Sequence, residues 1–414
     1  MQIHLVNTGS ELMLGRVLNT HQQWLCRELA DRGYVVTRQV AIDDSAASIL
    51  EAVREALAAA ELVIVTGGLG PTSDDRTRDL VAALLGRRLL EDESVVAHIS
   101  TFFSKRGRPL PPSTRVQAMV PEGATVLQNA HGTAPGLVME APDGRWLVML
   151  PGPPRELRPM FLSQVLPFLA QRFPVAHGFV CRTLKTTGLG ESFVEERVAP
   201  PLESLVKAGL ELGYCARVGD VDVRLAARGE HAAAIVAESE RIVRERLSEL
   251  VYGADDESLE AVVVRALTDR KQTLALAESC TGGFLAHRIT NVPGASVIFP
   301  GGFVTYSNEA KQQFLGVRAE TLTAHGAVSE ATVREMAEGA RGRTAAHYAL
   351  AVTGIAGPGG GTDDKPVGTV WISLATAAGT QAIKKFNPVE RETFKYVTSQ
   401  QALDLLRREM VRKT

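Results

Sequence analysis

Residues 278–283 read Glu-Ser-Cys-Thr-Gly-Gly and stand between an expected strand and an expected helix. At such a turn the hydroxyl of Ser279 can face a ligand, while the backbone N–H groups that follow point to a developing oxyanion. Tyr306 and Lys311 follow another expected strand, and a serine with a lysine or tyrosine base is a known nucleophile arrangement. The plain structural alternative is that Ser279 caps the helix beside a close glycine turn.

The neighbouring Cys280 is the rival nucleophile, because a thiol is intrinsically more reactive than a hydroxyl. A helix N-terminus favours the thiolate, whereas Ser279 needs a base such as Lys311 with a lowered pKa. Adjacent residues leaving a strand point to opposite sides, so only one of the two can face a substrate. We predict that Ser279 is the nucleophile and keep Cys280 as the alternative.

A second group of chemically suited residues, 66–77, follows the apolar run 62–65. It contains three glycines, whose backbone N–H groups can approach an anion ahead of a helix N-terminus. Asp74 and Asp75 could hold a divalent cation that bridges phosphate oxygens. Ordinary helix capping is the alternative explanation. No P-loop lysine follows the glycines, which argues against a nucleotide hydrolase of that type.

Three more loops rich in glycine and proline follow expected strands. Residues 131–136 and 151–154, the latter followed by Glu156, would join residues 66–77 at one end of a single sheet. That placement matches the rule that ligands bind outside the carboxyl ends of the strands. The third loop, residues 353–361, could carry a phosphate-bearing substrate or act as a flexible turn.

Alternating apolar runs and helical patterns are expected to position these residues. In the first part we predict strands at 3–6, 34–40 and 62–65, helices at 12–32, 46–60 and 155–169, and a hairpin joining 136–139 to 146–150. Short strands that alternate with helices indicate βαβ units around a parallel sheet.

A small βαββα module is predicted next, before an exposed joint at Asp255 and Asp256. Its elements are strands at 181–187, 213–217 and 221–227 and helices at 191–205, strained by Pro200 and Pro201, and 232–250. Strand and helix patterns then resume, with a helix at 259–267 and strands at 273–277, 302–305 and 348–352. We therefore predict three domains, residues 1–171, 172–254 and 255–414.

Bulk composition is that of a globular protein. The 414 residues are 45% hydrophobic and 22% charged, and the net charge of -2 gives no support to nucleic-acid or membrane-surface binding. The four cysteines form no C-x-x-C pair, which argues against a zinc site, and the nine histidines show no metal-binding spacing. We expect a soluble cytoplasmic protein without a membrane span.

Taken together and in order, the motifs resemble those of the CinA, or competence/damage-inducible protein, family across essentially the whole chain. The likeness rests on residues 8–11, 67–72, 74–75, 132–136 and 150–154, and then on residues 278–283, 301–302, 306–311, 326–329, 353–358 and 365–370. The resemblance implies an α/β fold: an N-terminal three-layer molybdopterin-binding-like domain, a small α+β middle domain and a C-terminal amidohydrolase domain.

The resemblance also implies two reactions. The C-terminal domain would deamidate nicotinamide mononucleotide (NMN) to nicotinic acid mononucleotide and ammonia, without a cofactor. The N-terminal domain would hydrolyse ADP-ribose to AMP and ribose 5-phosphate with a divalent metal, Mg²⁺, Mn²⁺ or Co²⁺. The alternatives are that the N-terminal domain only binds a pterin or nucleotide, or that the chain acts through a protein partner in DNA uptake or recombination. A homodimer without direct nucleic-acid contact is expected.

Roles carry over from the family residue by residue. Ser279 would be the nucleophile, Lys311 and Tyr306 the proton-handling pair, and Thr353 a contact to substrate or oxyanion. The other implied substrate contacts are Thr281, Gly282, Gly283, Asn308, Gly354, Arg391, Gly67, Gly68, Gly70, Thr72, Thr133 and Gly152, and the implied metal ligands are Asp74, Asp75 and Glu156.

The chain departs from the family pattern at two places. Asn19 and His21 stand where the family usually shows an acid and then an asparagine. The usual F-x-G-[DN]-R pattern appears as Phe-Asn-Pro-Val-Glu-Arg at residues 386–391, which shifts Arg391 away from the expected phosphate-binding position.

Overall fold

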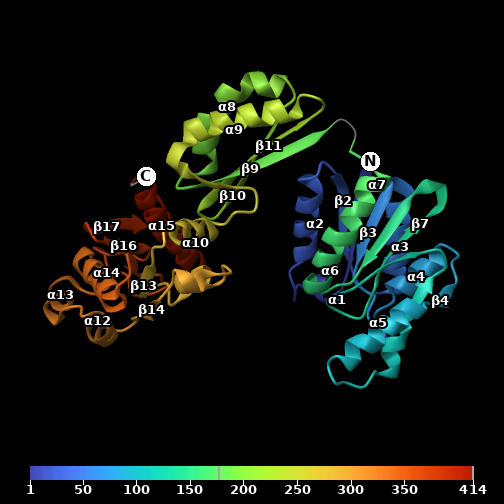
Figure 1. The fold of residues 1–414 in the computed structure, drawn as a ribbon, viewed down its shortest axis with the longest axis horizontal. Helices are drawn as coiled ribbons and strands as arrows, with labels where there is room; N and C mark the ends of the chain where they lie inside the picture. Colours follow the sequence, from blue (N-terminus) through green and yellow to red (C-terminus); the bar gives the residue numbers. More distant parts are fainter. Residues whose placement is uncertain (176–177, 413–414) are drawn as a thin grey trace. The chain divides into compact units, whose positions relative to one another are not determined.

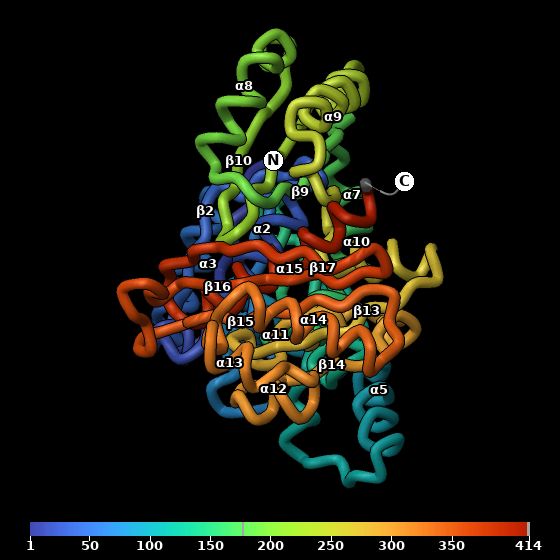
Figure 2. Tube along the Cα trace, turned by 90° about the vertical axis from the view of Figure 1, so that its left-hand side faces the viewer, coloured from blue at the N-terminus to red at the C-terminus, as the bar shows by residue number. Residues whose placement is uncertain are grey.

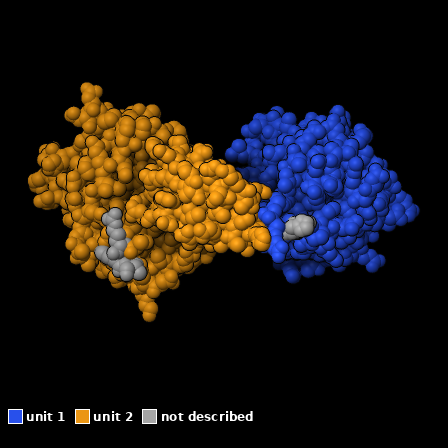
Figure 3. Space-filling view, turned by 90° about the horizontal axis from the view of Figure 1, so that it is seen from above, with its two compact units in different colours: residues 1–181, 228–230 blue, residues 182–227, 231–414 orange. Residues whose placement is uncertain are grey.

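A computed structural model describes residues 1–175 and 178–412. The chain forms two compact units, residues 1–181 with 228–230 and residues 182–227 with 231–414 (Figure 3). The middle segment, predicted as a separate domain, therefore packs mainly as part of the second unit. In the described part of the chain, no helix is both long and apolar enough to cross a bilayer.

Unit 1 is built around a six-stranded mixed sheet (Figure 1). Its strands, in spatial order, are β2 (Val35–Ile42), β1 (Gln2–Thr8), β3 (Leu62–Thr66), β8 (Trp146–Leu150), β7 (Gly136–Glu140) and β6 (Thr125–Leu127). The first four are parallel, and β7 and β6 continue the sheet antiparallel. A separate pair, β4 (Leu89–Glu91) and β5 (Met119–Pro121), was not predicted.

Helices cover both faces of this sheet. Residues of β3 alternate between two cores: Val63 and Val65 pack with α3 (Ala46–Ala59), α4 (Thr77–Leu84) and α5 (Glu93–Ser104). Leu62 and Ile64 pack instead with α2 (Thr20–Ala30), α6 (Pro154–Met160) and α7 (Leu166–Arg172). Successive side chains of a strand point to opposite faces, so this unit is a three-layer α/β domain.

The prediction of one continuous helix over residues 12–32 was wrong. The chain forms a short α1 (Ser10–Met13), a loop, and then α2. Asn19 begins the second helix by accepting a hydrogen bond from the N–H of Gln22, at 3.1 Å. Gly15 in the loop has a φ of 66°, a left-handed conformation that ends the first helix. The predicted helix at 155–169 is also interrupted, by a π-helical turn at Phe161–Val165.

The middle segment of the chain forms a four-stranded sheet with two helices. The strand order is β10 (Glu211–Arg217), β11 (Asp220–Arg228), β9 (Phe179–Thr187) and β12 (Val251–Ala254), with α8 (Glu191–Lys207) and α9 (Ala232–Leu247). The prediction lacked β12, and α8 continues through Pro200 and Pro201.

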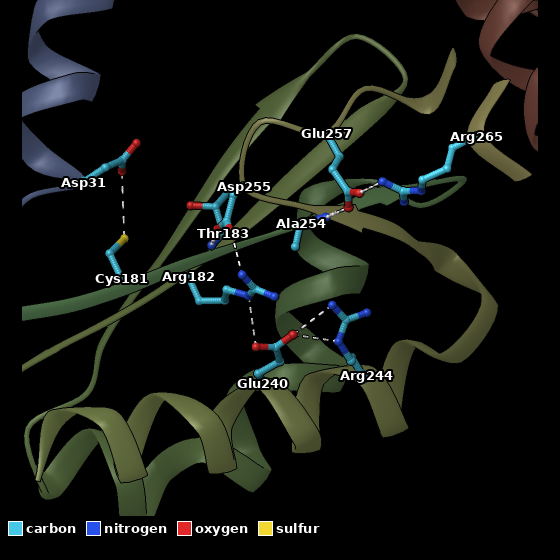
Figure 4. A network of polar contacts seen from close by, with 10 residues as sticks. All are labelled: Asp31, Cys181, Arg182, Thr183, Glu240, Arg244, Ala254, Asp255, Glu257 and Arg265. Atoms are coloured by element: carbon cyan, nitrogen blue, oxygen red, sulfur yellow. Dashed lines mark hydrogen bonds and ion pairs between the residues drawn. The ribbon is translucent and has the colours of Figure 1, made fainter. Parts of the chain in front are cut away.

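Ion pairs hold the joint between this segment and the C-terminal part (Figure 4). Arg182 on β9 pairs with Glu240 on α9 and with Asp255, and Asp255 also accepts the N–H of Thr183 at 3.1 Å. Asp255 is exposed, as predicted, and is held by the ion pair with Arg182 and by the N–H of Thr183.

The C-terminal part repeats a three-layer arrangement (Figure 2). Its sheet has the order β14 (Gly301–Val304), β13 (Leu274–Glu278), β15 (Tyr348–Gly354), β16 (Thr369–Thr376) and β17 (Gly379–Phe386), with β14, β13 and β15 parallel. Leu274 and Leu276 pack with α10 (Leu259–Asp269), α11 (Phe284–Thr290) and α15 (Arg391–Arg412). Ala275 and Ala277 face α14 (Glu330–Thr344), beside α12 (Asn308–Leu315) and α13 (Ala319–His325).

Candidate functional site

The C-terminal part contains a pocket of about 280 Å³ where β13, β14 and β15 end. Ser279 follows β13 directly, Lys311 lies on α12 after β14, and Thr353 and Gly354 end β15. The carboxyl ends of parallel strands meet at one edge of a sheet, which brings together residues far apart in sequence. Of the predicted residues, Ser279, Tyr306, Lys311, Thr353, Gly354 and Arg391 line this pocket.

Lys311 and Ser279 are in direct contact. The Nζ of Lys311 lies 3.1 Å from the Oγ of Ser279 and donates to the carbonyl of Thr305 at 2.8 Å. Lys311 is 1% exposed and Ser279 is 8% exposed, so the contact is shielded from bulk water. A lysine and a serine in this geometry can exchange a proton without an intermediary.

The protonation of Lys311 follows from its surroundings. Burial lowers the pKa of Lys311, since desolvation disfavours the charged ammonium, and the interactions with Cys280 and Glu309 oppose this shift only in part. No ion pair of Lys311 occurs in the part of the chain that the structure describes. A neutral amine carries the lone pair that a general base requires.

The pKa of Cys280 is shifted in the direction that disfavours its reactive form. It is 5% exposed, and burial together with the nearby charge of Glu278 raises the pKa of its thiol to about 12. A thiol in such surroundings stays protonated at neutral pH and is a poor nucleophile. The geometry therefore favours Ser279 over Cys280, although both touch the pocket.

Tyr306 and Arg391 form a separate contact at the pocket. Arg391 donates to the hydroxyl of Tyr306 at 2.9 Å and to the carbonyl of Gly357 at 2.8 Å. The hydrogen bonds of the described residues join Lys311 directly to Ser279 and do not pass through the hydroxyl of Tyr306. Despite its shifted position in the sequence, Arg391 thus reaches the pocket and brings a cationic side chain to it.

Of the remaining predicted substrate contacts, Thr353 lines the pocket and four others do not. The fully buried Thr353 donates to the carbonyl of Ala327 at 2.8 Å, so its hydroxyl oxygen remains an acceptor toward the pocket. Thr281, Gly282, Gly283 and Asn308 lie outside the pocket lining: the first three form the turn after the nucleophile, and Asn308 begins α12.

Unit 1 contains a larger pocket, of about 390 Å³, at the carboxyl ends of β1, β3 and β8. Eight of the predicted residues line it: Gly67, Gly68, Gly70, Asp74, Asp75, Thr133, Gly152 and Glu156. Glu11 and Asp44 add two further carboxylates. No lysine, arginine or histidine occurs among the described residues that line this pocket.

Close packing explains two of these glycines. A Cβ on Gly68 would collide with Thr77, and a Cβ on Gly70 would collide with the carboxylate of Asp75. Gly68 also has a φ of 67°, which side chains other than glycine rarely adopt. The glycines therefore let the start of α4 and the acidic turn fold back against the loop.

The acidic turn of this loop is held by its own hydrogen bonds. Asp75 accepts the N–H of Thr72 at 3.0 Å and its hydroxyl at 2.5 Å, which places Thr72 beside the pocket lining instead of in it. The neighbouring Asp74 is exposed. Glu156 is anchored by the amide of Asn129 at 2.8 Å.

No group of three or more His, Cys, Asp or Glu side chains among the described residues is close enough to hold a metal ion. The acidic lining nevertheless suits hard cations, because oxygen ligands are those that Mg²⁺ and Mn²⁺ prefer. Mg²⁺ in particular is commonly bound by one or two carboxylates together with substrate phosphates. Asp74 and Asp75 are two adjacent carboxylates in the lining of this pocket.

The two residues that depart from the family pattern have structural roles near this pocket. Asn19 caps α2, as described above, and the ring of His21 contacts the carbonyl of Gly152. Burial lowers the pKa of His21, so its ring is neutral at neutral pH.

Asp44, Glu11 and Gln117 line the unit 1 pocket but were not among the predicted site residues. Asp44 follows β2 and accepts hydrogen bonds from the N–H and hydroxyl of Ser10, at 2.7 and 2.8 Å. Its place at a strand end was a signal that could have found it, as was that of Glu11 after β1. Gln117 lies in a 3-10 helix far along the chain, and no motif marks it.

Comparison with known proteins gives three matches to family models. Residues 4–171 match a probable molybdopterin binding domain, residues 181–253 a damage-inducible protein CinA KH domain, and residues 256–410 the CinA C-terminal domain.

Individual relatives match along the whole chain. A CinA-like protein from Akkermansia muciniphila is 44% identical and covers 97% of this chain and 96% of its own. Another CinA-like protein, from Gemmatimonas aurantiaca, is 41% identical over 100% of this chain and 97% of its own. The crystal structure of the competence/damage inducible protein CihA from Agrobacterium tumefaciens is 40% identical, with a TM-score of 0.35, over 37% of this chain and 96% of its own.

Proposed function

Because this chain belongs to the CinA family, we propose that its C-terminal part is a nicotinamide-nucleotide amidohydrolase that converts NMN and water to nicotinic acid mononucleotide and ammonia. One observation carries the proposal: a buried lysine without an ion pair among the described residues lies 3.1 Å from a serine hydroxyl at the end of a parallel strand. Serine with a lysine base is an established acyl-transfer arrangement.

The reaction begins when the neutral amine of Lys311 accepts the Oγ proton of Ser279. The Oγ then attacks the carboxamide carbon of the substrate, and the protonated Lys311 returns the proton to the departing nitrogen as ammonia leaves. A water molecule, deprotonated by the same amine, attacks the acyl carbon and releases the carboxylate and the free Ser279 hydroxyl.

The oxyanion would be stabilised by backbone N–H groups after Ser279. The N–H of Gly282 donates to the carbonyl of Ser279 at 3.1 Å, and the N–H of Gly283 donates to Glu278 at 3.0 Å. The N–H groups of Cys280 and Thr281, which in this structure interact with the Cys280 sulfur, are the proposed donors. Arg391 would bind the substrate phosphate, since it is the lining cation that the chemistry does not use.

For unit 1 we propose metal-dependent hydrolysis of ADP-ribose to AMP and ribose 5-phosphate. The support is the pocket lined by five carboxylates (Glu11, Asp44, Asp74, Asp75 and Glu156) and by no described cationic side chain. A pyrophosphate could not approach this lining without cations that offset its charge. Asp74 and Asp75 would hold Mg²⁺, Mn²⁺ or Co²⁺, which would neutralise charge and activate water. Glu156, which the resemblance also implies as a ligand, is not close enough to share an ion with both of them in the described structure.

Product analysis of the purified chain tests both proposals. Incubation with NMN should release ammonia with or without a chelator, whereas ADP-ribose should yield AMP only when a divalent metal is present. If ADP-ribose binds without turnover under every metal tested, unit 1 is a binding module instead. Release of neither product, with a protein partner recovered that does not require Ser279 or Asp75, would favour the partner role.

A further inference from the structure

The residue before the nucleophile, Glu278, makes an unusual helix cap. The carboxylate accepts hydrogen bonds from the backbone N–H groups of Gly283 at 3.0 Å, Leu285 at 3.0 Å and Ala286 at 2.8 Å. The N-cap position of α11 is Gly283, which has no side chain to offer, so the cap comes from five residues earlier in the chain. Bonds from N–H groups to a carboxylate are stronger than those to neutral acceptors.

Glu278 is 1% exposed and does not line the pocket. Successive side chains leaving a strand point to opposite sides, so Glu278 faces α11 while Ser279 faces the pocket. The Glu278 carboxylate is therefore not placed to touch a substrate in the pocket.

These contacts fix the turn that carries Ser279 at both ends. At the strand end, the N–H of Ser279 donates to the carbonyl of Val352 at 3.0 Å. At the helix end, the Glu278 carboxylate holds the first turn of α11. Between them Gly282 and Gly283 both have positive φ, at 60° and 93°, a region that glycine adopts about as readily as negative φ, so the two glycines alone do not hold the turn in one conformation.

We propose that Glu278 is a positioning residue for the amidohydrolase reaction, an inference that rests on the function proposed above. By holding α11, it sets the direction of the Cys280 and Thr281 N–H groups relative to the Oγ of Ser279. A small displacement of such groups affects the rate more than it affects binding, because the oxyanion exists only in the reaction.

The test compares the full-length wild type with Glu278→Gln. Glutamine has the same size, but its NH₂ group cannot accept an N–H bond, so at least one of the three contacts is lost. We expect kcat for NMN to fall by about 10²-fold, as a misplaced catalytic geometry would cause, with KM changed little. The pH of half-maximal rate should stay where it is, since Lys311 is untouched.

A second measurement does not depend on turnover. Amide hydrogen exchange in residues 279–290 should become roughly tenfold faster or more in Glu278→Gln, as expected from loss of a charged hydrogen bond. The matched control is Ser258→Ala, which removes the cap contact to Ala261 at the start of α10 in the same unit. It should leave both kcat and exchange in 279–290 unchanged.

Each outcome decides the proposal. An unchanged kcat in Glu278→Gln, or an equal loss in Ser258→Ala, would overturn it, because the carboxylate would then contribute only general stability. If the wild type released no ammonia from NMN, the proposed function would fail. Amide hydrogen exchange in residues 279–290 of Glu278→Gln would then show by itself whether Glu278 holds the turn. Unchanged exchange would then overturn the inference as well.

Discussion

The Nζ of Lys311 and the Oγ of Ser279 lie 3.1 Å apart, on segments that are 32 positions apart in the sequence. Both side chains are nearly inaccessible to water. The contact depends on the pairing of two parallel strands. Ser279 directly follows β13, and the loop after β14 leads to Lys311 on α12.

Lys311→Met should abolish most of the activity. Methionine has a similar volume but no lone pair to accept the Ser279 proton, so kcat for NMN should fall by about 10²–10⁴-fold, the usual contribution of a general base. Steady-state ammonia release measures the change. A variant that stays folded and keeps a wild-type rate would exclude Lys311 as the base.

The pH dependence of the wild type follows from the lowered pKa of Lys311. The neutral amine is the active form, so the rate should fall as pH decreases through that pKa and should be retained above it. Because burial shifts the pKa downward from 10.5, the rate should be lost at a pH below that value. A kcat that rises as the pH falls would contradict the assignment of Lys311 as the base.

Arg391→Met tests recognition of the phosphate. Loss of a charged hydrogen-bond donor should reduce kcat/KM for NMN by roughly 10–100-fold. The same variant should change kcat/KM for nicotinamide riboside, which lacks the phosphate, much less. Equal losses for both substrates would mean that Arg391 acts through its contacts to Tyr306 and Gly357 instead.

Asp75→Asn should stop ADP-ribose cleavage and leave NMN deamidation untouched. Asparagine can still accept the N–H of Thr72, so the turn should survive while the charge that attracts a metal is lost. Asp79→Asn, on α4 outside the pocket, is the matched control. Loss of both activities in a folded Asp75→Asn protein would contradict independent sites.

A truncated chain of residues 255–414 should deamidate NMN unaided. The five-stranded sheet and its two cores lie within these residues, and so do all the lining residues of the C-terminal pocket. Truncation removes Arg182, the partner of Asp255, and also Asp220 and Glu249, which accept hydrogen bonds from Gln400 and Arg408 on α15, so the thermal transition of the truncated chain must first show that it is folded. Inactivity of a folded, monodisperse truncated chain would show that the middle segment completes the site.

Much of the fold could be predicted because its strands have clear patterns. The buried runs of β3 and β13 are short, apolar and followed by glycine-rich turns, which indicates parallel strands that end at a site. The break between α1 and α2 was missed because the apolar pattern continues across Gly15, and a single glycine is tolerated in helical sequences.

The site could be predicted only in part. Residues next to strand ends, such as Ser279 and Asp75, are marked by local sequence. Contacts made by tertiary packing are not. The hydrogen bond from Arg391 to Tyr306 joins residues 85 positions apart, and Gln117 reaches the unit 1 pocket through the packing of a 3-10 helix. The contact with Lys311 that distinguishes Ser279 from the equally buried Cys280 also depends on the folded domain.

The choice between the two adjacent nucleophiles tests the central claim most directly. Ammonia release from NMN should be compared in the wild type, Ser279→Ala and Cys280→Ala, each shown to be folded by its thermal transition. We predict that Ser279→Ala has no measurable deamidation, whereas Cys280→Ala and the alkylated wild type keep most of theirs. Full activity in Ser279→Ala, or a loss confined to Cys280→Ala, would contradict the assignment of Ser279 as the nucleophile.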